Sequence, residues 1–167
     1  MRALKLLLIL SALSLSLFAN EPPDAKKQTD ALRKRLVSYL AEEGLSPQVD
    51  KEGDISLIFH RKNGRTQQVF ISLEAWELSS SSYFKMWTRV KQGIGDLDAD
   101  TANRILAFNG KRVFPKCHLS KAGDKYVIIA ASFLPYDITK DRFLDAFGST
   151  AVDSDNLEEI ETKADEF

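Results

Sequence analysis

The feature that most constrains the fold is the run Lys125–Leu134, which is apolar on both sides of an extended chain. One set of alternating side chains is Tyr126, Ile128, Ala130 and Leu134, and the other is Val127, Ile129, Ala131 and Phe133. A strand that is apolar on both faces is usually buried on both. Pro135 ends the run. We therefore expect a strand inside a sheet, with something covering each face.

Earlier segments predict three more strands. Ile55–Arg61 and Thr66–Leu73 are rich in β-forming residues, and the Asn-Gly pair at 63–64 between them is a strong hairpin signal. Four serines at 79–82 indicate a loop, after which Tyr83–Lys91 alternates again. These segments predict a three-stranded antiparallel meander.

A second hairpin is expected from Arg112–Ser120 and Lys125–Leu134, joined by a turn at 122–124. The remaining periodic segments have the spacing of helices. They are Thr29–Glu43, a segment from Asp98 or Asp100 to Phe108, and one from Thr139 to Phe147 that Gly148 closes. A tail from about Ser154 could form a fourth amphipathic helix.

This order predicts an α+β domain: an antiparallel sheet of about five strands with helices on one face, in the order α-βββ-α-ββ-α. Helices on one face leave the other face of the doubly apolar strand to be covered. Three covers are open: the 157–167 tail folding back, a second copy of the chain, or a client protein.

The first nineteen residues have the pattern of a secretory signal: basic Arg2 and Lys5, an apolar-plus-serine run Leu6–Phe18, and small Ala19 at the cleavage position. The run is too short for a membrane span, which needs about 20 apolar residues. An uncleaved signal anchor is the alternative. We expect an exported chain, periplasmic or secreted, with no stable membrane span after cleavage.

The chain divides accordingly into a signal peptide at 1–19, a flexible leader at 20–28, the domain at 29–150, and an acidic tail or helix at 151–167. The net charge of −1 is unevenly distributed, because the tail is acidic and the middle of the chain is mildly basic. Such a weak field, on an exported chain, argues against nucleic acid as a partner.

The residues that could form a metal or catalytic site are better explained by structural roles. Asp96, Asp98 and Asp100 resemble the start of a calcium loop, but Thr101 stands where that loop needs glycine and Ala107 where it needs glutamate, so a helix cap is favoured.

The lone cysteine, Cys117, is expected to be a small buried strand residue, with an intermolecular disulfide or a reactive thiol as alternatives. Its neighbour His118 should point to the opposite face, which disfavours a shared zinc ion. The other histidine, His60, could serve Cys117 as a base only if the fold brought them together. We predict no catalytic residue, cofactor or metal site, and no enzyme.

A possible binding surface is the strand face of Tyr83, Lys85, Trp87 and Arg89, where aromatic and cationic residues alternate. Such a face could hold an anionic or peptide ligand by stacking and cation–π contacts. It could equally be a solvated strand face or the rim of a dimer.

Three stretches resemble the YbjN-like family, which has the fold of type III secretion chaperones. They are the hairpin segments 57–59 and 69–71, the helix at 101–110 followed by 112–114, and the strand at 126–135 leading to the helix at 139–147. The resemblance implies a bacterial, non-enzymatic, mostly dimeric binding or regulatory protein, with no catalytic residues to carry over. The familiar members are cytoplasmic, so this chain would be an exported one.

We therefore expect a non-enzymatic exported protein that acts through protein–protein contacts, chaperone-like or regulatory, as a homodimer or with a protein client. The alternative is a small-ligand or peptide binding module that uses the Tyr83/Trp87 face.

Overall fold

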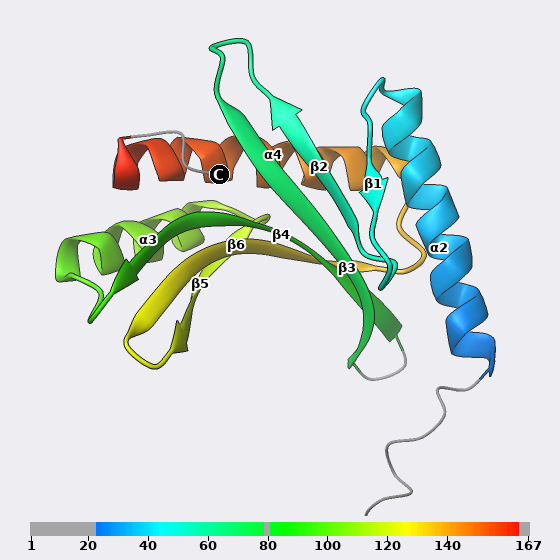
Figure 1. Cartoon of the computed structure of the whole chain (residues 1–167), viewed down its shortest axis with the longest axis horizontal. Coiled ribbons are helices and arrows are strands. Elements are labelled where there is room, and N and C mark those ends of the chain that lie inside the picture. The colour runs from blue at the N-terminus through cyan, green and yellow to red at the C-terminus, as the bar shows by residue number, and fades with distance from the viewer. Residues whose placement is uncertain (1–22, 79–80, 164–167) are drawn as a thin grey trace, which may run out of the picture.

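The computed structural model describes residues 23–78 and 81–163, so the expected signal peptide, the first leader residues and the end of the tail lie outside it. Its centre is a six-stranded antiparallel sheet in the order β1-β2-β3-β4-β6-β5 (Figure 1). The strands are β1 (Gln48–Val49), β2 (Ile55–His60), β3 (Thr66–Leu78), β4 (Ser81–Ile94), β5 (Lys116–Ala122) and β6 (Lys125–Pro135). The doubly apolar run is β6, between β4 and β5.

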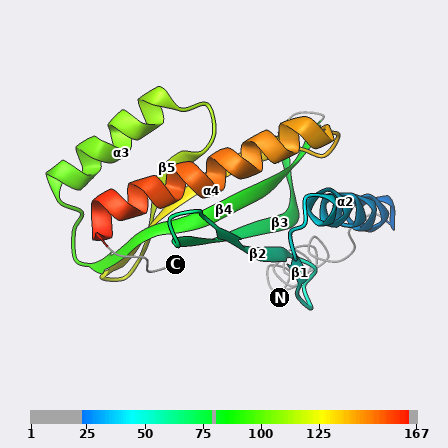
Figure 2. The same cartoon turned by 90° about the horizontal axis from the view of Figure 1, so that it is seen from above.

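Three described helices complete the domain: α2 (Pro23–Glu42), α3 (Ala99–Lys111) and α4 (Lys140–Thr162). Figure 2 shows α3 and α4 running over the sheet, with α2 at the end of the sheet where β1 lies. The α+β class and the expected order are confirmed, and the short β1 adds a sixth strand. Within the described ranges, no helix is both long and apolar enough to cross a membrane.

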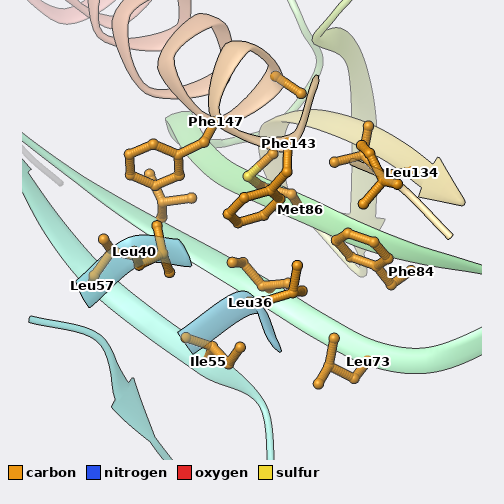
Figure 3. Close-up of a cluster of buried hydrophobic side chains, with 14 of the residues drawn as sticks. Leu36, Leu40, Ile55, Leu57, Leu73, Phe84, Met86, Leu134, Phe143 and Phe147 are labelled. Carbon is orange, nitrogen blue, oxygen red and sulfur yellow. The ribbon is translucent and has the colours of Figure 1, made fainter. Parts of the chain in front are cut away.

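The main core lies between the sheet and helices α2 and α4. Leu36 of α2 and Phe143 of α4 are fully buried against Phe84 and Met86 of β4 (Figure 3). Alternate β4 residues from Phe84 to Val90 point into this side, as period-two alternation requires. A smaller cluster under α3 includes Ile105, Cys117 and Ile128. All three helices therefore pack on one face.

The expected flexible leader is wrong over residues 23–28, because α2 begins at Pro23 rather than at Thr29. Proline suits the first turn of a helix, where its missing N–H has no partner to lose. The alanine, lysines and glutamine that follow are all good helix formers.

The expected stop at Gly148 is also wrong. Helix α4 continues to Thr162, so residues 151–162 belong to the domain rather than to a separate tail helix. A Cβ built on Gly148 would meet no atom within 4 Å, and the buried stripe simply continues past it. That stripe is Phe143, Ala146, Phe147, Thr150, Ala151, Ser154, Asp155, Leu157 and Glu158. The second half of this buried stripe is largely polar, so a search for apolar periodicity does not detect it.

Strand β5 begins at Lys116, four residues later than expected. Pro115 cannot donate a ladder hydrogen bond, so residues 112–115 form a connector instead. Strand β3 extends to Leu78, and β4 begins at Ser81, so Ser81 and Ser82 of the expected serine loop belong to a strand instead.

Candidate binding surface

The two surfaces singled out in the sequence are one surface. The antiparallel register of β4 and β6 sets Lys85 opposite Phe133, Trp87 opposite Ala131, and Arg89 opposite Ile129. Residues directly opposite in a sheet share a face. We call this the open face, because the described helices all lie on the other side. Its residues are Tyr83, Lys85, Trp87 and Arg89 of β4; Val127, Ile129, Ala131 and Phe133 of β6; Phe70 and Ser72 of β3; and Lys116 and His118 of β5.

The centre of the open face is a stacked aromatic pair. The rings of Phe70 and Trp87, directly opposite in the β3–β4 register, have centroids 4.4 Å apart and planes 17° apart. The indole Nε1 of Trp87 donates a hydrogen bond to Ser72 Oγ at 3.2 Å. Stacking and the indole bond hold the pair in place, which makes it a preorganised apolar platform.

Two cations lie over this pair. Lys85 Nζ is 5.6 Å from the centroid of the Trp87 ring, and the Arg89 guanidinium carbon is 6.0 Å from that of Phe70. Long cationic side chains of this kind cover apolar surface with their aliphatic stems. An incoming flat ligand would have to displace Lys85 to stack on Trp87.

The charged residues at the centre of the open face are all basic. Burial lowers the pKa of Lys85. Burial also lowers the pKa of His118, and the nearby charge of Lys85 lowers it further. Strands β4, β6 and β5 contain no Asp or Glu at all. The face is therefore apolar and positively charged, with half-exposed Phe133 at 42%.

The structure keeps Cys117 and the histidines apart. Cys117 packs on the helix side, where burial raises the pKa of its thiol to about 12. Its neighbour His118 pairs with Ile129 on the open face. His60 lies on β2, four strand spacings from β5, or about 19 Å at ~4.8 Å per spacing. Cys117 therefore has neither a histidine base nor an accessible thiolate.

The three aspartates at 96–100 diverge. Asp98 caps α3, accepting from the Thr101 backbone N–H and from its hydroxyl, both at 2.8 Å. The first of these two bonds is the main cause of the lowered pKa of Asp98. Asp96 accepts from Lys121 Nζ at 2.6 Å, and Asp100 lies in the first helical turn. Within residues 23–78 and 81–163, no three His, Cys, Asp or Glu side chains are grouped to hold a metal ion.

Sequence reasoning missed what the acidic end of α4 does. Asp155 and Glu158 are fully buried and face Arg61 and Arg65 from the β2–β3 hairpin. One turn further on, the Glu161 carboxylate accepts from Arg104 of α3 at 2.5 Å. Through these ion pairs the acidic stretch of α4 holds the helix against the β2–β3 hairpin and against α3. The signal that could have shown it is the spacing of 151, 154, 155 and 158, which continues the buried stripe.

A cleft of about 630 Å³ was also missed. It lies between one side of α4 and the 112–114 connector, with Leu134 and Ile138 in its lining. Val113 is 78% exposed on this connector. Lys116 Nζ bonds to the Asn109 carbonyl at 2.6 Å, and the Asn109 amide bonds the Cys117 backbone on both sides, at 2.7 and 2.8 Å. These bonds hold the connector that presents Val113.

Comparison with known proteins adds only a likeness of fold. No family model matches the sequence, and no curated protein matches it. Among solved structures, the chain is similar to the crystal structure of YbjN from E. coli, described as a candidate transcription regulator. The match has a TM-score of 0.47 and 15% identity, and covers 78% of this chain and 90% of that chain. YbjN is the namesake of the family that the sequence resembles. At this TM-score the match carries no argument about what the protein does.

Proposed function

We propose that this chain is a non-enzymatic exported protein that works by binding another protein chain through the open face, in a chaperone-like or regulatory role. The observation that carries the proposal is the one-sided architecture. The described helices all pack on one face of the sheet, while the other face presents the Phe70–Trp87 platform between cations. Contiguous apolar surface of this kind is typical of an interaction site.

The chemistry of the open face favours a binding role. Aromatic side chains carry large contact area and are enriched, with arginine, where proteins bind one another. Trp87, Phe70 and Arg89 supply that combination in one patch. The candidate nucleophile Cys117 is buried on the opposite side of the sheet, away from this surface.

Site-specific photocrosslinking in the exporting cell tests the proposal. A photoreactive residue at Phe133 or Arg89, on the open face, should yield a discrete crosslinked protein band. The matched control is the same residue at Lys34, exposed on α2. Equal crosslinking from both surfaces, or none from the open face, would overturn the proposal.

Export is tested by the mass of the purified chain. Cleavage after Ala19 gives a protein that begins at Asn20, whereas an uncleaved anchor leaves the full chain with the membrane fraction. A full-length chain that stays in the cytosol would remove the exported part of the proposal.

Whether the chain forms the expected homodimer is a separate question from whether the open face binds a protein. Light scattering on the purified protein measures it directly. A dimer whose crosslinks join Arg89 to Arg89 would place a second copy on the open face, and a monomer would leave that face to a client.

A second candidate function, binding of a small ligand or peptide, is favoured by the cleft beside α4. A volume of about 630 Å³ lies within the usual range for ligand sites. The sequence points to the Tyr83/Trp87 face for this role. A thermal-shift screen with Trp87→Ala and Ile138→Ala variants separates the two locations, because each substitution should abolish only the response of its own site.

A further inference from the structure

We infer that the partner of the open face is an acidic amphipathic segment of another protein, rather than a second copy of this chain. This inference rests on the proposed function and adds the chemistry of the partner. It is carried by the distribution of charge across three neighbouring strands.

The charge of the open face has a single sign over its whole central area. Strand β4 places Lys85 and Arg89 on it and β5 adds His118, and none of β4, β6 and β5 contains an acid, whereas the ammonium of Lys116 is bonded to the carbonyls of Asn109 and Arg112. The neighbouring β3 carries the exposed Glu74, beyond Ser72 toward the end of that strand. A partner that covers the centre therefore meets cations separated by apolar side chains.

The environment of Lys85 shows what such a partner must supply. Its ammonium lies over the Trp87 ring and forms no salt bridge with any described residue. Burial already disfavours its charge, and it adds to the positive potential felt by His118. Further desolvation by an uncharged partner would raise that cost, whereas a carboxylate on the partner would offset it.

Three acids of α4 already have partners within the chain. Asp155 and Glu158 are buried in pairs with arginines of the β2–β3 hairpin, and Glu161 is bound to Arg104. Because β4, β6 and β5 supply no acid, a dimer that buried the two open faces against each other would set Lys85 and Arg89 of one copy against the same cations of the other. Like charges brought together in an interface disfavour association. Charge complementarity therefore favours a client that carries Asp or Glu among apolar residues.

The test uses the protein purified after export and two synthetic probes. One is an amphipathic peptide with glutamates on one side and valine and phenylalanine on the other, and its twin has lysine at every glutamate position. Fluorescence anisotropy at about 50 mM salt should show at least tenfold tighter binding of the glutamate peptide, with the difference shrinking at about 500 mM.

Charge variants locate the site. Lys85→Glu with Arg89→Glu should reverse the preference between the two peptides. The control Lys34→Glu with Lys62→Glu makes the same change in net charge at exposed positions off the open face, and should leave the preference intact. If the first variant fails to fold, Lys85→Gln with Arg89→Gln should abolish the preference without reversing it.

The outcomes separate this inference from the proposed function. Equal binding of both peptides, lost in Trp87→Ser, would overturn the acidic partner but leave the open face as a contact surface. No binding of either peptide, together with no crosslinks from Phe133, would overturn both. Tighter binding of anionic lipid vesicles or of a DNA duplex, or a dimer sealed through Arg89, would also overturn the acidic protein partner.

Discussion

Asp155, fully buried on α4, accepts a hydrogen bond from Nε of Arg65 at 2.8 Å, across ninety residues of chain. Arg61 donates to the same carboxylate, and also to the Asn156 side chain at 2.8 Å. One carboxylate thus ties both ends of the β2–β3 turn to the last helix.

We predict that Asp155→Ala destabilises the protein by about 3 kcal/mol. The substitution leaves two arginines without their shared buried partner, and breaking a buried pair in this way usually costs about 3–5 kcal/mol. The lower end applies because Arg61 and Arg65 retain 22% and 13% exposure. Urea unfolding gives the value. The control Asp145→Asn, exposed on the same helix, should change the free energy of unfolding by less than about 0.5 kcal/mol.

The Asp155 carboxylate also illustrates which features of this fold cannot be predicted from the sequence. Alternation and turn signals were enough to predict the hairpins and the helix order, because strand alternation and the Asn-Gly turn are local properties. The continuation of α4 was missed because its buried stripe turns polar after Ala151. Burial of the Asp155 and Glu158 carboxylates is tolerated only because arginines from a hairpin distant in sequence pair with them. Such a pairing cannot be predicted from the residue pattern of the helix alone.

The glycines of α4 and β4 give a matched pair of predictions. Gly148→Ala should stabilise the protein by about 0.5–1 kcal/mol, because glycine is costly inside a helix and the new methyl group meets open space. Gly93→Ala should destabilise it by about 1–3 kcal/mol, because its Cβ would lie 2.6 Å from the buried Tyr126 ring. Both values come from urea unfolding, and equal effects of the two substitutions would contradict the packing described around Tyr126.

The stability of the fold should fall in acid partly through Glu161. The hydrogen bond from Arg104, with further help from Thr101 and Lys91, holds the pKa of Glu161 below its ordinary value of 4.5, against a smaller opposing effect of burial. A carboxyl with a depressed folded pKa stabilises the fold above the unfolded pKa, and this contribution disappears as the pH falls through the folded value.

Glu161→Gln should therefore lower stability at pH 7 and flatten the decline below about pH 4.5. Unfolding measured from pH 7 down to pH 3 checks this. Glu159→Gln, exposed on the same helix, is the control and should keep the wild-type slope. An unchanged slope in Glu161→Gln would show that other carboxyls carry the acid dependence.

The candidate site was predictable in its residues but not in its extent. The alternation of Tyr83, Lys85, Trp87 and Arg89 and the second apolar side of β6 each stood out in the sequence. Only the strand order shows that they adjoin, because β4 and β6 are separated in sequence by α3 and β5. Phe70, which stacks on Trp87, was not singled out, since nothing local to β3 identifies its partner across the sheet. The cleft beside α4 depends on a connector that was expected to be strand.

The lone cysteine provides the last prediction. Burial raises the thiol pKa of Cys117 to about 12, so only about one thiol in ten thousand is ionised at pH 8. Alkylation by iodoacetamide at that pH should be at least a thousandfold slower than for an exposed thiol of ordinary pKa. Because the chain has one cysteine, each modified molecule gains a single adduct that mass spectrometry counts directly. Urea should restore rapid modification, as unfolding removes the packing against Val90 and Ile128. Rapid alkylation of the folded protein would contradict the burial of Cys117 and would make a disulfide with a second chain feasible.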